Sequence, residues 1–249
     1  MTSVHIDGVT IDDGSTVEGV LTLTSLTGWR DGVDFRRERT PRPAAHGEFS
    51  AKGWKSGRLV RAEFEVLTRP AFGVSHVEAL DRVIGILDDG GEGELFVDEG
   101  DRQLTAMASR YGQPEVTEIA EGLLSAVSLR FLTPDPRRYG RSTAIPAAAS
   151  LTLFHRGNSA ALPVLRVNGP SAGYSLTFST GDIVTVPGGL GAGQQDVLTA
   201  ASQWVKRNGS TVPLLGVTGH VPEVPRGVDV VVTVAGAPSV AADVVDTYS

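Results

Sequence analysis

The 249-residue sequence has no cysteine and no long apolar run, and each absence excludes a class of protein. Without cysteine there is no disulfide, no thiolate metal ligand and no thiol nucleophile, while the redox compartment stays open. No stretch approaches the roughly 18 apolar residues of a membrane span. The first residues lack a basic segment followed by an apolar run. We therefore expect a protein that is neither secreted by a signal peptide nor inserted in a membrane.

Positive charge is also scarce, with 22 Lys and Arg against 29 Asp and Glu and a net charge of −7. An acidic balance disfavours general binding to phosphate backbones, which gains affinity when a positive patch releases counterions. The charge is uneven, because residues 1–140 hold 16 basic and 23 acidic residues, while residues 141–249 hold six of each. Length and charge together predict two domains, 1–140 and 141–249.

Helical periodicity is confined to one segment. The chain contains 30 glycines and 14 prolines, with many valines and threonines, which is typical of a mainly β protein. One helix is expected at about residues 75–88, where Ser75 and Glu78 fit a capping box. Its buried stripe is expected to consist of four apolar residues at helical spacing: Val77, Leu80, Ile84 and Leu87.

The first domain otherwise has the pattern of an antiparallel sheet. Asp7-Gly8 between short apolar runs predicts a hairpin, and the period of two from Val60 to Val66 predicts a half-buried strand. Pro134-Asp135-Pro136 ends the last strand, because proline lacks the N–H that a sheet ladder needs. Further strands are expected around Leu21 and Leu23, from Leu95 to Val97, from Leu104 to Ala108 and from Leu123 to Leu132. We expect a β-sandwich or split barrel crossed by the helix.

Residues 137–150 have the composition of a linker. Beyond them, short apolar segments alternate with turn residues every 8 to 12 positions, and no helix is expected. This pattern predicts a two-sheet sandwich of jelly-roll type. Eight strands are expected: Leu151–Phe154, Val164–Val167, Tyr174–Phe178, Ile183–Val186, Val197–Thr199, Trp204–Lys206, Val228–Val234 and Ala241–Tyr248.

No catalytic constellation emerges from the motifs. Gly169–Gly173 matches the G-x-S-x-G nucleophile elbow around Ser171, but a strand pattern follows where the elbow needs a helix. The glycine-rich segment 187–196 lacks the Gly-Lys-Ser/Thr ending of a phosphate-binding loop. The five histidines are scattered, so surface or turn positions are expected, and no metal or other cofactor. One alternative function is that of a hydrolase with Ser171 as its nucleophile. It predicts an esterase activity that is abolished by Ser171→Ala.

Five arginines gather in the segment WRDGVDFRRERTPRPAAHGEF (residues 29–49), together with acids and two prolines. So many guanidinium groups cannot be buried unpaired, and the segment is therefore expected to be an exposed arm or long loop. Beside an acidic domain, such an arm could bind a neighbouring copy head to tail; the alternative is a solvated loop. The oligomer-interface residues predicted on this ground are Arg30, Arg36, Arg37, Arg39 and Arg42.

Trp204 is the second candidate for binding. A tryptophan on a sandwich strand can stack on a sugar ring, although an ordinary packed or half-exposed aromatic residue is the favoured explanation. The functional alternative is therefore a carbohydrate-binding module that recognises host-surface glycans through the second domain and Trp204.

The order of segments resembles the distal tail proteins (Dit) of long-tailed phages with non-contractile tails. In the first half the resemblance lies in PAAHGEF, the strand from Gly57 to Val66, the helix from Ser75 and DPRRYG. In the second half it lies in FHRGNSAALPVLRVNGP, TGDIVTVP, VKRNGS and VPRGVDVVVTVAG. One departure is Arg137 after Asp135-Pro136, where such proteins often have an aromatic residue.

The resemblance implies a structural, non-enzymatic virion protein that is assembled in the host cytoplasm and located at the phage tail tip. It implies a tail-tube-like first domain that forms a homohexameric ring and a galectin-like second domain. The implied partners are the major tail tube protein, a tail-tip or tail-associated protein and receptor-binding components. DNA would meet the protein only in passage through the ring, where a surplus of carboxylates would repel phosphates.

Overall fold

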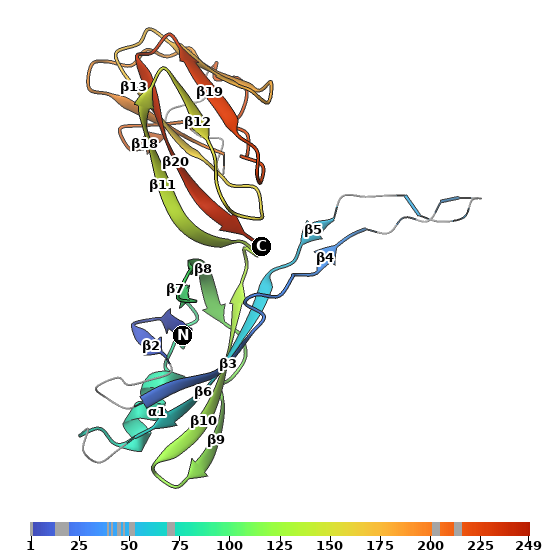
Figure 1. The fold of residues 1–249 in the computed structure, drawn as a ribbon, viewed down its shortest axis with the longest axis vertical. Coiled ribbons are helices and arrows are strands. Elements are labelled where there is room, and N and C mark those ends of the chain that lie inside the picture. Colours follow the sequence, from blue (N-terminus) through green and yellow to red (C-terminus); the bar gives the residue numbers. More distant parts are fainter. Residues whose placement is uncertain are drawn as a thin grey trace. The chain divides into compact units, whose positions relative to one another are not determined.

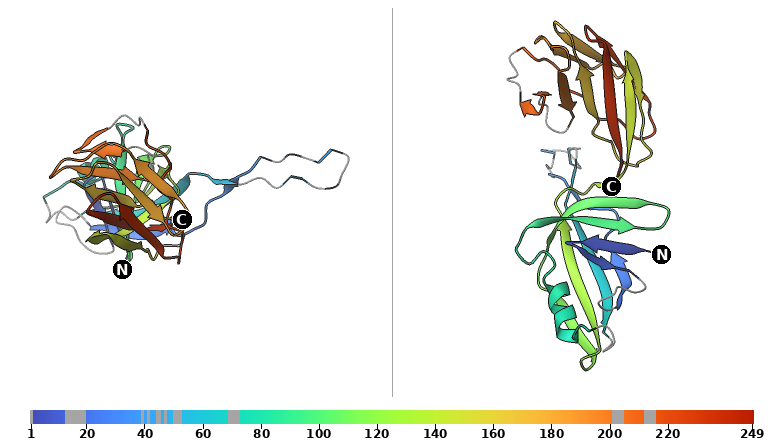
Figure 2. Two further views of the ribbon diagram at one scale, coloured as in Figure 1. Left: turned by 90° about the horizontal axis from the view of Figure 1, so that it is seen from above. Right: turned by 90° about the vertical axis from the view of Figure 1, so that its left-hand side faces the viewer.

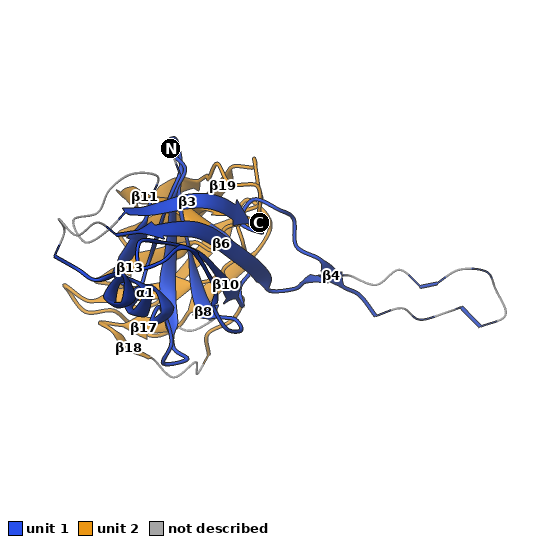
Figure 3. Ribbon diagram, turned by 90° about the horizontal axis from the view of Figure 1, so that it is seen from below, with its two compact units in different colours: residues 1–138, 249 blue, residues 139–248 orange. Residues whose placement is uncertain are grey.

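The structure is a computed structural model that describes residues 2–12, 20–38, 40, 42–43, 46, 48–49, 53–68, 73–200, 205–211 and 216–249. It is 55% strand and 4% helix, so the expectation of a mainly β chain with one helix is confirmed. The chain forms two compact units, residues 1–138 with Ser249 and residues 139–248 (Figures 1 and 3). Each unit is described by itself below.

Unit 1 is built on the long strand β10, which has different neighbours along its two edges. β6 follows the whole of one edge, with Phe131 opposite Val60. The other edge pairs first with β9 and then with β8, so the sheet splits into two layers there. The elements are β1 (Ser3–Ile6), β2 (Val9–Ile11), β3 (Val20–Thr27), β4 (Phe35–Arg36), β5 (Trp54–Lys55), β6 (Arg58–Leu67), α1 (His76–Ile84), β7 (Glu92–Asp98), β8 (Gln103–Arg110), β9 (Glu115–Ala120) and β10 (Leu124–Thr133).

The split sheet encloses the core of unit 1. β3, β6, β10 and β9 form one layer, while β8 continues through β7 and β1 to β2 as the other. Alternate side chains along β6, β7 and β8 are buried, which agrees with the split-barrel arrangement expected from the sequence. The predicted hairpin joins β1 and β2 through Asp7 and Gly8, whose φ values of 49° and 74° are those of a tight hairpin turn.

The helix α1 begins with the predicted capping box. Ser75 accepts the backbone N–H of Glu78, and the Glu78 carboxylate accepts the backbone N–H of Ser75 at 2.9 Å. The predicted buried stripe is wrong, because Val77 is 66% exposed, Leu80 and Ile84 are only partly buried, and of the four only Leu87 is buried. The helix buries three other residues instead: His76, Ala79 and Val83.

His76 explains the orientation of the helix. Its ring nitrogens lie 2.9 Å from Thr68 Oγ1 and 2.8 Å from Ser125 Oγ, both inside the unit. Two satisfied hydrogen bonds to a buried ring fix one face of a short helix more firmly than a few apolar contacts do. The periodicity of apolar residues in the sequence could not predict this orientation, because the residue that sets it is a buried polar histidine.

Unit 2 is a sandwich of two antiparallel sheets. One has the order β18-β17-β16-β13-β20-β11 and the other the order β12-β19-β14-β15. Buried aliphatic residues, with Tyr174 and Phe178, fill the space between them. The elements are β11 (Arg138–Ala148), β12 (Ser150–Leu153), β13 (Val164–Asn168), β14 (Tyr174–Phe178), β15 (Ile183–Val186), β16 (Gln195–Thr199), β17 (Val205–Arg207), β18 (Ser210–Thr211), β19 (Val230–Ala235) and β20 (Ser239–Tyr248).

Every strand expected in the second half overlaps an observed strand of unit 2. The expected linker at 137–150 is wrong, because it contains the 11-residue strand β11, which pairs with β20. Only Arg138 of this strand is buried, so its sequence carries no alternation to mark it as a strand. Strand β9 was missed for the same reason, since five of its six residues are exposed.

Candidate functional site

The main candidate site is the arm, which we define as residues 34–56 of unit 1. Its first and last residues pair as β4 and β5, with Phe35 opposite Lys55 and Arg36 opposite Trp54. The backbone N–H of Phe49 donates to Thr40 O at 3.0 Å, so the two sides also meet further along. The described residues of the arm extend away from the body of unit 1 (Figures 1, 2 and 3). The expectation of an exposed arm therefore agrees with the described residues.

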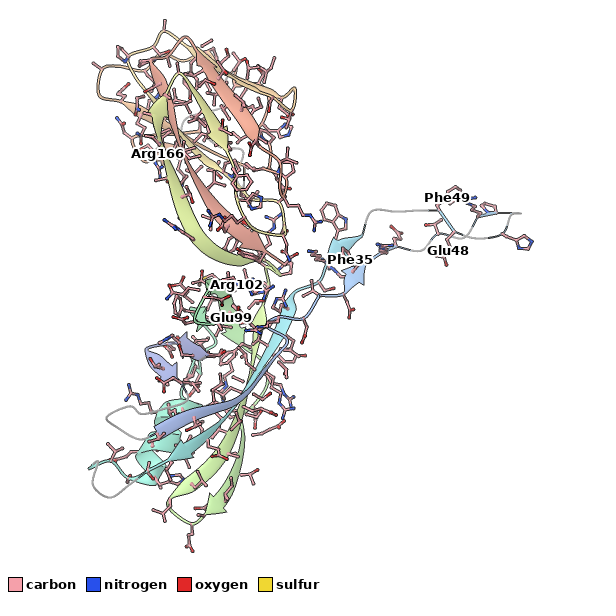
Figure 4. The ribbon with its side chains drawn as sticks, viewed as in Figure 1. Phe35, Glu48, Phe49, Glu99, Arg102 and Arg166 are labelled. Carbon is pink, nitrogen blue, oxygen red and sulfur yellow. The ribbon has the colours of Figure 1, made fainter. Side chains whose placement is uncertain are left out.

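Three large aromatic side chains are exposed on this arm. Phe35 is 53% exposed, Phe49 55% and Trp54 64%. Two arginines lie over them: the Arg37 guanidinium is 5.5 Å from the Phe35 ring centroid, and that of Arg42 is 5.6 Å from the Phe49 ring. Figure 4 labels Phe35 near the start of the arm and Phe49 far along it. Exposed aromatic residues beside arginine have the composition of protein interface hot spots.

The predicted interface arginines do not all have the same environment. Arg36, Arg37 and Arg42 are exposed on the arm, whereas Arg39 lies outside the described residues. Arg30 lies before the arm and pairs within its own unit, its Nε being 2.7 Å from Glu99 Oε1. The interface predicted from the sequence included the arginines but not the aromatic residues of the same arm. The available signal was large aromatic residues in a segment too polar to form a core.

Two buried arginines fix the base of the arm. Arg58 Nη1 donates to the carbonyl oxygens of Gly28 at 2.7 Å and Asp31 at 2.5 Å, and Arg138 Nη1 donates to Trp29 O at 2.5 Å. The Arg138 guanidinium also lies 5.6 Å from the centroid of the Trp29 ring. Both guanidiniums therefore hold the segment that leads from β3 into the arm.

Neither of these two arginines forms an ion pair within the part of the chain that the structure describes, although the charges of Asp31 and Glu99 act on Arg58 and Arg138, respectively. Burial lowers the pKa of Arg58, and burial together with the charge of Arg58 lowers the pKa of Arg138 to about 10. The Nε atoms of both, like Nε1 of Trp29, are buried without a hydrogen-bond partner among the described residues. Buried charge satisfied only by carbonyl groups is costly, so its presence indicates that the position of this segment matters.

Glu99 completes the charged cluster at this end of unit 1. Its side chain is 2% exposed and accepts from Arg30 at 2.7 Å and from Arg102 at 2.7 Å. Figure 4 labels Glu99 and Arg102 at the end of the hairpin that β7 and β8 form. Burial alone would raise the pKa of Glu99, but the hydrogen bonds from the two arginines outweigh it, and the pKa is lowered.

The open face of the layer β3-β6-β10-β9 is polar. Arg61 pairs with Glu63 at 2.9 Å and with Glu115 at 3.3 Å, and Arg130 also pairs with Glu115. Glu65 extends outward on the same strand as Arg61 and Glu63. Three carboxylates against two guanidiniums leave this described face with a small negative excess and no positive patch.

The sequence motifs for catalysis do not form a site. The Ser171 hydroxyl donates to Gly173 O at 2.9 Å and accepts the backbone N–H of Gly173 at 3.0 Å. Strand β14 follows directly, so the helix required after a nucleophile elbow is missing at this place. In the glycine-rich segment, the backbone N–H of Gly191 donates to Gln194 Oε1 at 2.7 Å, which is an internal turn contact.

The histidines differ from the expectation in part. His76 and His155 are buried, so the expected surface or turn position is wrong for these two. His155 holds two loops of unit 2 together, with Nε2 3.2 Å from Val224 O and Nδ1 accepting the backbone N–H of Gly157 at 3.0 Å. Among the described residues no group of three or more potential ligands could hold a metal ion.

Trp204, the predicted glycan contact, lies outside the described residues. The carbohydrate-binding alternative therefore stays a prediction, which glycan binding by the full chain and its loss in Trp204→Ala would test. Across the described segments, no helix is long and apolar enough to cross a membrane.

Comparison with known proteins gives matches in structure alone. No protein-family profile and no curated protein sequence matches the chain. The Dit protein (gp 19.1) of phage SPP1, described as a paradigm of the hub adsorption apparatus in phages infecting Gram-positive bacteria, superposes with a TM-score of 0.78. The sequences are 12% identical, and the match covers 100% of both chains.

Two structures of the phage P2 baseplate in its activated conformation also match. The calcium form gives a TM-score of 0.51 at 6% identity over 99% of this chain and 98% of that chain. The strontium form gives 0.50 at 7% identity over 98% and 97%. The resemblance inferred from the sequence is thereby confirmed for the fold, and the described residues have a fold similar to that of the SPP1 Dit protein.

Proposed function

We propose that this protein is the distal hub of a phage tail, a ring of identical subunits that joins the tail tube to the host-adhesion apparatus. The observation that carries the proposal is the arm, which exposes three aromatic side chains and three arginines on a Dit fold. A two-stranded hairpin is marginal in water, and exposed aromatic groups favour burial against a partner. The role is structural, without bond making or breaking.

The ring is formed by the arm of one subunit docking on the next. A closed ring needs a heterologous contact, in which two different surfaces of the same chain meet. The arm supplies the basic surface, and the acidic unit 1 of the neighbour supplies the complement. The homohexamer implied by the family resemblance meets this requirement, since six identical heterologous contacts close a ring. The rigid base at Arg58 and Arg138 directs the arm toward its neighbour.

The assembled hub belongs to the virion, at the tail tip, after assembly in the host cytoplasm. Its partners are the major tail tube protein on one side and a tail-tip or tail-associated protein on the other, with receptor-binding components at the rim. The first structural neighbour is itself described as a paradigm of the hub adsorption apparatus. Residues outside the arm supply these contacts, because the arm is occupied by the neighbouring subunit.

Charge reversal on the arm tests the ring contact. Changing Arg36, Arg37 and Arg42 to glutamate should lower the ring fraction in sedimentation velocity at physiological salt, because the arm would then face a surface of its own sign. The control variant reverses the charge of two exposed basic residues of unit 2, Arg141 and Lys206. It should leave the ring fraction unchanged. A ring fraction unaffected by the arm variant would contradict the docking role of the arm.

The open face of unit 1 faces the channel in this proposal. Its small negative excess, from Glu63, Glu65 and Glu115 against two arginines, keeps affinity for passing DNA low. Reversing Glu63 and Glu65 to lysine should raise binding of labelled duplex DNA by the assembled ring in about 50 mM salt, where phosphate contacts are strong. Strong DNA binding by the unaltered ring would contradict this placement.

A further inference from the structure

Unit 2 contains a groove of about 430 Å³, formed by none of the residues of the arm or its base. It is lined by residues 154–158 together with Arg226 and Gly227. The register of the β12–β19 pair explains why these segments meet. Leu153, the last residue of β12, is opposite Val230, the first residue of β19, so the loop leaving one strand borders the loop entering the other.

The floor of this groove is rigid. His155 is buried and bonds to both loops through Val224 O and the backbone N–H of Gly157. The bridge between Ala161 and Val224 ties the loops a second time, with both N···O distances at 2.9 Å. A Cβ at Gly157 would lie 1.9 Å from Thr247 O, so only glycine fits there against β20. A preorganised floor reduces the entropy lost when a ligand binds.

The walls of the groove carry positive charge that the described chain does not neutralise. Arg156 and Arg226 are exposed, and neither guanidinium has a hydrogen bond or ion pair among the described residues. The Asp246 carboxylate accepts the backbone N–H of Arg156 at 2.7 Å. Phe154, beside them, is 44% exposed. Two unpaired guanidiniums and an exposed ring on a rigid floor are typical of a site for carboxylate groups.

A neutral sugar fits this groove less well. Sugar sites orient hydroxyl groups with amide or carboxylate side chains, and the one such residue lining the groove, Asn158, already has a partner within the chain. The ligand favoured by two free guanidinium groups is a pair of carboxylates on one short segment. Such a segment exists in this chain.

The acidic turn, residues 88–94 (DDGGEGE), leads into β7 and includes the first three residues of that strand. Asp88, Asp89, Glu92 and Glu94 are all exposed, and no lysine or arginine occurs from residue 83 to residue 101. Gly90 has φ 77°, and the Asp89 carboxylate accepts the backbone N–H of Gly91 at 2.8 Å, so the turn has a defined conformation that holds four acidic residues within seven positions. We propose that the groove at Arg156 and Arg226 binds the acidic turn of a second copy of this chain. This inference rests on the self-assembly proposed above and adds a second contact, independent of the arm.

Peptide binding tests the contact without relying on assembly. A fluorescent peptide of residues 86–96 should bind the full-length chain at low ionic strength, where exposed charges are least screened. Changing Arg156 and Arg226 to glutamate should weaken binding about tenfold or more, and the peptide with Asn and Gln in place of its acids should bind equally weakly. Heparin serves as a probe for an anionic polysaccharide; if heparin binds through these arginines and the peptide does not, the proposal is overturned.

A charge exchange between two variants tests the contact between whole subunits. The groove variant carries Arg156→Glu and Arg226→Glu, and the turn variant carries Asp88→Lys, Asp89→Lys and Glu92→Lys. Each alone pairs like charges and should assemble less than the unaltered chain in sedimentation. A 1:1 mixture pairs opposite charges at every such contact and should regain assembly. Unfolding midpoints close to that of the unaltered chain should accompany these losses, because all the changed residues are exposed.

The outcomes separate this inference from the proposed function. If the unaltered chain assembles and the groove variant assembles equally well, the groove contact is wrong while the hub proposal stands. If the mixture fails to regain assembly, the acidic turn is not the occupant. If the unaltered chain never assembles, the hub proposal fails, and the peptide titration alone decides whether the groove binds the acidic turn.

Discussion

Asp196 shows how a single residue organises unit 2. Its side chain is fully buried. Its carboxylate accepts hydrogen bonds from Nε and Nη2 of Arg207 at 2.8 and 2.9 Å, and from the Tyr174 hydroxyl at 3.0 Å. Arg207 also donates to Gly189 O at 2.7 Å. The carboxylate therefore joins strands of both sheets to the glycine-rich loop. Burial and the neighbouring carboxylate raise the pKa of Tyr174, which keeps the hydroxyl protonated as a donor.

The change Asp196→Asn should lower the free energy of unfolding by about 2 kcal/mol, because Arg207, whose side chain is 22% exposed, loses its charged hydrogen-bond partner. Urea unfolding followed by circular dichroism measures the difference. The matched control is Asp243→Asn, which breaks the surface pair of Asp243 with Arg166 and should cost about 1 kcal/mol or less. Equal costs for the two changes would contradict a structural role for Asp196.

Glu99 gives the base of the arm a dependence on pH. Because its pKa is lower in the folded state than its ordinary value of 4.5, the folded state binds fewer protons there. Its contribution to stability is therefore complete above about pH 4.5 and is lost as the pH falls through the lowered value. Urea midpoints measured from pH 6 to pH 3 should fall less steeply in Glu99→Gln. Parallel curves for the two proteins would contradict this linkage.

At the scale of single residues the sequence allowed only part of the site to be predicted. The arginines at 36, 37 and 42 could be placed on an exposed arm, because clustered guanidiniums cannot be buried unpaired. Arg58 could not be singled out, since it stands at the start of a strand pattern as an ordinary charged residue. Its burial depends on carbonyl groups from the Gly28–Asp31 turn and from Pro136, which only the folded chain brings together.

Among the elements, the arm differs most clearly from the strands that form the core. Phe35 and Trp54 on the arm are more than half exposed, whereas Phe64 on β6 is 1% exposed. Hydrophobic stabilisation follows the area removed from water, so the arm residues contribute little to the stability of a single subunit. In the proposed ring, their contribution comes from the contact with a neighbour.

The double change Phe35→Ser and Trp54→Ser should therefore change the free energy of unfolding of the isolated subunit by less than about 0.5 kcal/mol. The same double change should abolish ring formation in sedimentation velocity. Phe64→Ala is the reference for a core residue, with an expected cost of about 3–5 kcal/mol. A large loss of stability in the arm variant, or an intact ring, would contradict the assignment of the arm to the interface.

Elements with more buried residues were predicted more accurately from the sequence. In unit 2 the strands were located because Val, Leu and Ile alternate with polar residues and turn residues separate them, and Tyr174–Phe178 and Ile183–Val186 match the expected bounds residue for residue. β9 and β11 were not predicted, because a strand with little buried surface needs no alternation of apolar and polar residues. The helix was located by its capping box, yet its face was misjudged, since the hydrogen bonds of His76 to Thr68 and Ser125 set its orientation.

For the whole molecule, the uneven charge fits the proposed assembly. The 16 basic and 23 acidic residues counted for residues 1–140 also fall within residues 1–138, so unit 1 holds the entire net charge. An acidic unit with one basic arm carries both halves of a heterologous contact, whereas a uniformly charged subunit would repel its copies. In the proposed ring, the same excess would disfavour retention of DNA in the channel.

Electron microscopy of the purified chain in negative stain tests the central claim most directly. The account predicts closed rings with a central hole and six-fold symmetry for the unaltered protein, and single subunits for the chain with glutamate at Arg36, Arg37 and Arg42. Unaltered protein that remains a single subunit at every concentration, or rings that persist unchanged in the arm variant, would contradict it.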